Sequence, residues 1–178
     1  MSIATTLYHR FLGHFPVDAL LAVNDPALHR LPRFAIVRNP WERLVSAYYF
    51  AAAGHGDSEI AAEIAPHVHR QLKSISSFER FVKDWLPRQD LMRLDGVLRP
   101  QTYYVVARDG TMPFDHLGRQ EDLAATEAWL TELLGREVRF PLTNQSQRGD
   151  RREEYDSEMR DIVASLYAED IERFGYEF

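Results

Sequence analysis

Residues 34–50 read Phe-Ala-Ile-Val-Arg-Asn-Pro-Trp-Glu-Arg-Leu-Val-Ser-Ala-Tyr-Tyr-Phe, and this stretch decides the fold. It opens on four apolar residues, and a short continuous apolar run is typical of a buried parallel strand. Asn39 suits the N-cap of a helix and Pro40 suits its first turn, so a helix is predicted from Pro40 onward. The stretch therefore predicts a strand, a tight turn and a helix, the repeating unit of an α/β sheet.

The turn after this strand is a candidate anion site. In an open α/β sheet, ligands bind beyond the carboxyl ends of the strands. A helix that starts there offers free backbone N–H groups and the positive end of its dipole, and Arg38 can add a fork of donors. Ser46 follows about two helical turns along. These residues alone equally allow Arg38 to pair with a carboxylate and Ser46 to pack against the sheet.

The rest of the sequence alternates helical and strand-like segments. No repeat or long linker divides it, so residues 1–178 are expected to form a single α/β domain with a small, mainly parallel sheet. Short strands are expected at 103–107 and 116–118. Asn24–Pro26 is expected to be a turn and Thr143–Asp150 a loop, and helices are expected at 2–12, 17–23, 58–73, 78–85, 121–134 and about 154–173.

Composition narrows the class of protein. The chain has 178 residues, 45% of them hydrophobic, and no cysteine, which excludes disulfides and thiolate sites. Its net charge of −6 disfavours nucleic acid as a partner. No apolar run reaches the roughly 18–20 residues of a membrane span and no signal peptide is visible, so a cytoplasmic protein is expected unless an N-terminal segment is missing. The only lysines are Lys73 and Lys83. The excess of arginine fits either anion recognition or coding bias.

Residues 34–48 resemble the second signature of the carbohydrate sulfotransferases, which use 3′-phosphoadenosine 5′-phosphosulfate (PAPS). That signature is an apolar strand, Arg-[Asn/Asp]-Pro and, a few residues on, Arg-Leu-[Val]-Ser-[Ala]-Tyr. The resemblance implies a P-loop sulfotransferase-like, three-layer α/β fold, with Arg38 and Ser46 as ligands of the 3′-phosphate of PAPS. It also implies that Arg148 closes over this phosphate, with Arg151 and Arg152 as alternatives. Further similar segments are Arg99–Tyr104, Phe114–Leu123, Asn144–Ser146 and, toward the C-terminus, Tyr155 and Tyr167–Tyr176.

One family segment has no counterpart in this sequence. Sulfotransferases of this kind begin with a strand and a loop of the form Pro-Lys-x-[Ala/Gly]-Gly-x-Ser, which holds the phosphosulfate. Lys73 and Lys83 fall in predicted helices instead, as solvated charges. Met1-Ser2-Ile3 is similar to the end of this loop in some members, which makes Ser2 a candidate remnant and predicts an N-terminally truncated fold. The alternative is a genuine short form with an ordinary N-terminus.

Transfer of a sulfuryl group to a hydroxyl needs a base for the acceptor proton, and histidine suits this role near neutral pH. Gly13-His14 resembles the Gly-His segment of the uronyl and heparan 2-O-sulfotransferases, which makes His14 the candidate base and His9 the runner-up. The other interpretation of His14 is a helix-terminal histidine bonded to backbone. His67 and His69 would lie on different faces of a helix, so no metal site is expected.

The predicted function is therefore PAPS-dependent transfer of a sulfuryl group to a hydroxyl, with a glycan as the expected acceptor and no metal. The alternative is a non-catalytic remnant that binds adenosine 3′,5′-bisphosphate or a protein partner.

Overall fold

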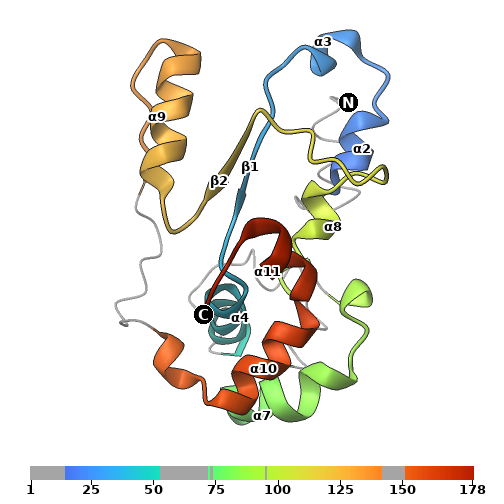
Figure 1. Ribbon diagram of the computed structural model, residues 1–178, viewed down its shortest axis with the longest axis vertical. Coiled ribbons are helices and arrows are strands. Elements are labelled where there is room, and N and C mark those ends of the chain that lie inside the picture. Colours follow the sequence, from blue (N-terminus) through green and yellow to red (C-terminus); the bar gives the residue numbers. More distant parts are fainter. Residues whose placement is uncertain (1–14, 53–71, 73, 95, 142–150) are drawn as a thin grey trace. The chain divides into compact units, whose positions relative to one another are not determined.

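A computed structural model describes residues 15–52, 72, 74–94, 96–141 and 151–178, which Figure 1 draws in colour. The chain groups into two compact units. The first combines Met1–Arg38 with Tyr103–Gly149, and the second combines Asn39–Thr102 with Asp150–Phe178. The single domain expected from the sequence stays a prediction.

The first unit holds a parallel two-stranded sheet. Strand β1 (Phe34–Val37) pairs with β2 (His116–Arg119) along their whole length. Backbone bonds continue the pairing at both ends, because Asp115 N–H donates to the Arg33 carbonyl at 2.8 Å and Gln120 N–H donates to the Val37 carbonyl at 2.8 Å. The strands predicted at 34–37 and at 116–118 are confirmed. Their carboxyl ends lie at one edge, so Arg38 and Gln120 leave the sheet side by side.

Helix α9 (Leu123–Leu134) packs against β2, as Figure 1 shows. The Asp122 side chain caps its start by accepting from Ala125 N–H at 3.2 Å, and Gly135 ends it with a positive φ of 62°. This confirms the predicted helix. The contact is close at Gly118, where an added Cβ would lie 2.1 Å from Oγ1 of Thr126. A glycine is therefore required for the strand and helix to approach this closely.

In the described residues before β1, from Phe15 onward, the chain forms two short helices. Helix α2 (Val17–Leu21) begins directly after Pro16, within the predicted segment. Helix α3 (Pro26–His29) begins at the last residue of the predicted turn. Asp25 caps it by accepting from Ala27 N–H at 2.9 Å. The turn residues thus start a helix of one turn.

The strand expected at 103–107 is wrong, because this segment contains helix α8 (Thr102–Val105). The run Tyr103–Ala107 has the β-branched and aromatic residues of a strand. Its first turn is instead capped from far along the chain. The Asp170 carboxylate accepts from Gln101 N–H at 2.7 Å and from Thr102 N–H at 2.8 Å. Capping by a distant residue thus overrides the local strand preference.

The second unit is helical. The longest helix among its described residues is α4 (Pro40–Ala52), which begins at the residue where the sequence predicts it. The helix expected at 78–85 begins with α7 (Phe78–Arg80), which Ser77 caps, and it continues through the π-turn η1 (Phe81–Trp85) into the 3-10 turn η2 (Leu86–Arg88). The turns η3 (Leu91–Arg93) and η4 (Arg151–Glu154) follow along the chain. The buried side chains of this unit include Trp41, Leu44, Val45, Tyr48, Leu72, Phe78, Phe81, Val82, Leu86, Leu98, Tyr155, Met159, Val163, Tyr167 and Phe174.

The single helix expected at 154–173 is two helices, α10 (Ser157–Leu166) and α11 (Ala168–Phe174). Tyr167 lies between them with φ −116° and ψ 28°. Its hydroxyl donates to the Leu98 carbonyl at 2.7 Å. Met159, Val163, Tyr167 and Phe174 of this segment are buried.

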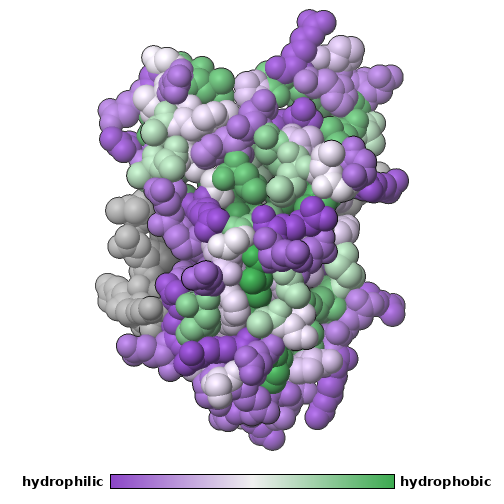
Figure 2. All heavy atoms as spheres, in the orientation of Figure 1, coloured by the Kyte–Doolittle hydropathy of each residue, from purple (hydrophilic) through white to green (hydrophobic). Residues whose placement is uncertain are grey.

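The expected helices at 2–12 and, apart from residue 72, at 58–73 lie outside the described residues, as does the whole of the expected loop at 143–150. Within the part of the chain that is described, no helix combines the length and the apolar character that a bilayer crossing requires. On the face in Figure 2, hydrophobic residues lie among hydrophilic ones.

Candidate functional site

The predicted site is centred on the start of α4. Arg38 is half-buried and follows β1 directly, so it leaves the sheet at the carboxyl edge, as the sequence predicts. Asn39 is 5% exposed and begins the second unit. Its Oδ1 accepts from Trp41 N–H at 3.1 Å and its carbonyl accepts from Arg43 N–H at 2.8 Å. The predicted N-cap is therefore confirmed.

This cap corrects one expectation about the helix start. Pro40 has no N–H group, and the N–H of Trp41 is already bonded to Asn39. All three of these residues are also buried. The first turn therefore offers an anion fewer free N–H groups than the sequence suggests, and side chains must carry more of the recognition.

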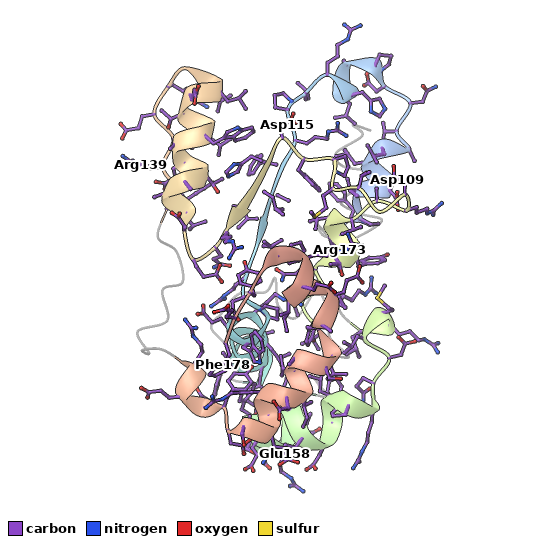
Figure 3. The ribbon with its side chains drawn as sticks, viewed as in Figure 1. Asp109, Asp115, Arg139, Glu158, Arg173 and Phe178 are labelled. Carbon is purple, nitrogen blue, oxygen red and sulfur yellow. The ribbon has the colours of Figure 1, made fainter. Side chains whose placement is uncertain are left out.

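The C-terminal segment fixes this first turn in place. Asn39 Nδ2 donates to the Glu177 carbonyl at 2.8 Å. The indole N–H of Trp41 donates to the Arg160 carbonyl at 3.2 Å. Phe178, labelled in Figure 3, meets the Trp41 ring edge-on, with 5.6 Å between ring centroids. The start of α4 is thus held by residues more than one hundred positions along the chain.

Ser46 lies on the half-exposed face of α4, one helical turn after Glu42. Glu42 Oε1 lies 3.0 Å from Nη2 of Arg152, which belongs to η4. On the next turn the hydroxyl of Tyr49 donates to the carboxylate of Glu154, also in η4. The face that carries Ser46 is therefore bordered by charged side chains of η4.

A buried ionic network lies behind this face. Asp170 is 0% exposed, and its Oδ2 lies 3.6 Å from Nη2 of Arg43. Arg43 also donates to the Val97 carbonyl at 3.2 Å, and its guanidinium lies over the ring of Tyr167. Burial raises the pKa of the Tyr167 phenol to about 12. This network joins α4 to α11 and to the chain before α8.

Sequence reasoning missed this network. Arg43, Gln101 and Asp170 belong to the similar family segments but have no assigned role there. A carboxylate within a helix pattern does not by itself indicate burial. The signal that could have found Asp170 is its place on the core side of the last helix, between Tyr167 and Phe174.

Tyr48 ends the pattern Arg-Leu-Val-Ser-Ala-Tyr and is structural. It is 4% exposed, and its hydroxyl donates to the Ile75 carbonyl at 3.1 Å. Its ring stacks on Phe81 with 5.2 Å between centroids and also contacts Phe78. Burial, with a smaller effect of the Glu154 charge, raises the pKa of this phenol. Tyr48 thus anchors α4 in the aromatic core of the second unit.

Lys83 is expected to be a solvated charge, and this expectation is wrong. Its Nζ lies 2.7 Å from Asp156, 2.9 Å from Glu158 and 3.2 Å from Glu79. Hydrogen bonds to these carboxylates raise the pKa of the ammonium group. Lys83 therefore ties η1 to the start of α10.

The remaining predicted site residues, His14, Ser2 and Arg148, lie outside the described residues, as does His9. Arg38 and Ser46 are described, and they belong to different compact units. Over the described ranges, no group of three or more His, Asp or Glu side chains is placed to hold a metal ion.

These features define a class: a small α/β protein with an arginine at the carboxyl edge of parallel strands, followed by a capped helix that carries a serine. The family model described as "Sulfotransferase family" matches residues 21–177. The chain therefore belongs to the sulfotransferase family, and this supports sulfuryl transfer in general. No curated protein and no solved structure matches the chain.

Proposed function

We propose that the protein transfers the sulfuryl group of PAPS to a hydroxyl of a carbohydrate. The observation that carries this proposal is the family match over residues 21–177. PAPS supplies an activated sulfuryl group when bound. In the transfer a new S–O bond forms to the acceptor oxygen, the S–O bond to the phosphate breaks, and the acceptor proton passes to a base. The products are a sulfate ester and adenosine 3′,5′-bisphosphate.

Arg38 and Ser46 are the proposed ligands of the 3′-phosphate. A guanidinium provides parallel charge-assisted bonds to phosphate, and a serine hydroxyl adds one donor. The half-burial of Arg38 at the carboxyl edge of β1 supports its role. Because Asn39 caps the first turn of α4 and leaves fewer free N–H groups there, these side chains carry more of the recognition. Arg148 and Ser2 are proposed as further PAPS ligands.

His14 is the proposed base. A positioned base contributes roughly 10²–10⁴-fold to the rate of such a step. Replacement of His14 by Asn is therefore expected to lower kcat by a factor in this range with a smaller change in KM. An activity that is unchanged in His14→Asn assigns the proton to another group, His9 first.

Calorimetry with adenosine 3′,5′-bisphosphate tests the nucleotide site. A charge-assisted bond contributes about 1.5–3 kcal/mol, so Arg38→Ala is expected to weaken binding by about tenfold to a hundredfold. The matched control is Arg30→Ala, because Arg30 is exposed in the same unit. If the wild-type chain does not bind the bisphosphate, or if Arg38→Ala binds it equally well, the proposed site is wrong.

Transfer from radiolabelled PAPS to a panel of glycans, simple alcohols and phenols tests the reaction and the acceptor. Label is expected on a glycan. Label on phenols alone refutes the carbohydrate acceptor. Binding of the bisphosphate without transfer to any acceptor supports the non-catalytic alternative.

A further inference from the structure

One edge of β1 has no strand beside it among the described residues. The carbonyls of Arg33 and Val37 accept from the segment that contains β2, so the odd-numbered residues of β1 turn their backbone groups toward β2. Successive residues of a strand alternate in direction, so Phe34 and Ile36 turn their N–H and C=O groups to the opposite edge. This free edge of β1 is a template on which a further strand can pair.

The free edge is also apolar. Phe34 is 41% exposed and Ile36 is 38% exposed. Both side chains lie on the face of the sheet that carries α9, because Phe34 contacts Trp129 with 5.9 Å between ring centroids and Ile36 follows two residues along the strand. Helix α9 packs against β2, as Figure 1 shows, and leaves these side chains partly uncovered. Residues 34–37 contain no charge and no proline, which commonly protect an exposed edge from pairing.

The free edge is complementary to itself. Two β1 strands can pair antiparallel with Ala35 of one copy opposite Ala35 of the other. Phe34 then lies opposite Ile36 of the second copy, and the two residues exchange backbone bonds in both directions. Each phenyl ring packs across the strands on an isoleucine, a favourable cross-strand pair. Arg33 lies opposite Val37, so no arginine of one copy faces an arginine of the other.

Other antiparallel registers fit this edge less well. A shift of two residues in one direction places Pro32, which has no N–H group, opposite Ile36. The same shift in the other direction places the charge of Arg38 opposite Phe34. A symmetric antiparallel pair also closes on itself, so assembly stops at two copies. A second copy of the chain therefore satisfies the free backbone groups and covers the exposed apolar side chains with the same four residues.

We propose that the protein forms a symmetric dimer in which the β1 strands of two copies pair edge to edge and join their two-stranded sheets into one. The inference does not depend on the proposed function, because the contact uses neither the nucleotide nor the acceptor. The paired edge is only four residues long, so the dimer is expected to be weak and to dissociate on dilution.

Sedimentation velocity at about 1–200 μM chain tests the dimer. The mass is expected to rise with concentration from 20.7 kDa toward twice this value. Ile36→Lys places a charge on the free edge and is expected to weaken association at least about tenfold. The matched control is Leu134→Lys on α9 in the same unit, because Leu134 is 51% exposed and is expected to lie away from the contact. Circular dichroism checks that both variants fold.

A disulfide tests the register. The chain has no cysteine, so Ala35→Cys carries a single thiol. In the proposed register the two residues at position 35 form a non-hydrogen-bonded pair with Cα atoms about 4.5 Å apart, within the roughly 4.4–6.8 Å that a disulfide spans. Mild oxidation is expected to link Ala35→Cys into a covalent dimer and to leave the single-thiol control Leu134→Cys largely unlinked. Adding Ile36→Lys to Ala35→Cys is expected to prevent the link.

A wild-type chain that stays monomeric over the whole concentration range overturns the inference. A dimer that Ile36→Lys leaves intact also overturns it, because the contact then lies elsewhere. The register is wrong if Ala35→Cys links no faster than Leu134→Cys, and this comparison decides the matter if Ile36→Lys does not fold. A monomer that binds adenosine 3′,5′-bisphosphate refutes this inference and leaves the proposed function standing.

Discussion

Replacement of Asp170 by Ala is expected to destabilise the protein more than any surface substitution. The carboxylate is 0% exposed and accepts from Gln101 N–H at 2.7 Å and from Thr102 N–H at 2.8 Å. It also lies 3.6 Å from Arg43, whose side chain is only 17% exposed. Alanine would leave two buried donors and a largely buried cation without this partner. Such changes cost about 3–5 kcal/mol in free energy of unfolding.

The variant Asp170→Asn is expected to lower the free energy of unfolding by less than Asp170→Ala does. The amide oxygen still accepts one backbone N–H, while the negative charge beside Arg43 is lost. The expected cost is about 1–3 kcal/mol, that of leaving a buried donor unsatisfied. Glu169→Gln on the same helix is the matched control. Glu169 forms an exposed i,i+4 pair with Arg173, so its loss is expected to cost less than about 0.5 kcal/mol.

The measurement is urea denaturation followed by circular dichroism and by tryptophan fluorescence, which must coincide for a free energy to be defined. The expected order of stability is wild type and Glu169→Gln, then Asp170→Asn, then Asp170→Ala. If Asp170→Ala costs no more than Glu169→Gln, the buried carboxylate does not hold α11 to α4 and α8, and the reasoning is refuted.

Three further predictions concern other contacts. Asn39→Ala should lose about 1–2 kcal/mol in urea denaturation, because it removes the cap of α4 and the bond to Glu177, whereas Asn39→Asp keeps the cap and should lose less. Gly118→Ala should lose about 1–3 kcal/mol, because its Cβ would lie 2.1 Å from Oγ1 of Thr126, and adding Thr126→Ala should recover part of it; an unchanged midpoint would contradict the close approach. Burial raises the pKa of Tyr167 to about 12 in the folded chain, above its unfolded value of 10.0, so its contribution to stability is complete below pH 10 and is lost as the pH rises toward 12. Tyr167→Phe should show a shallower loss across this range, and an identical profile would contradict the assignment.

The elements that the sequence predicts correctly are those whose signals are local. The apolar run 34–37 forms β1, Asn39 caps α4, and the helix expected at 121–134 is present as α9. A capping side chain bonds a backbone group only two or three residues away, so a short stretch of sequence is enough to predict the cap. The placement of Arg38 at the end of a strand follows from the same short stretch of sequence.

The sequence predictions are wrong where a residue far along the chain determines the local structure. The 103–107 segment has strand propensity, but its preceding N–H groups are bonded by Asp170, and it starts as a helix. The last helix is interrupted at Tyr167, whose hydroxyl is held by the Leu98 carbonyl. Both partners lie 69 positions along the chain from the residue whose local structure they determine.

The sequence by itself determined the strand–turn–helix unit, the family resemblance and the positions of Arg38 and Ser46, because periodicity and capping act over a few residues. Only the tertiary structure decided which residues of the same stretch are structural. It placed Arg43 and Tyr48 in buried contacts and set Arg152 against Glu42, because burial and ion pairing join segments far apart in the chain. A buried carboxylate such as Asp170 is stable only where the fold collects its donors, and those donors are separated from it by up to 69 positions in the chain.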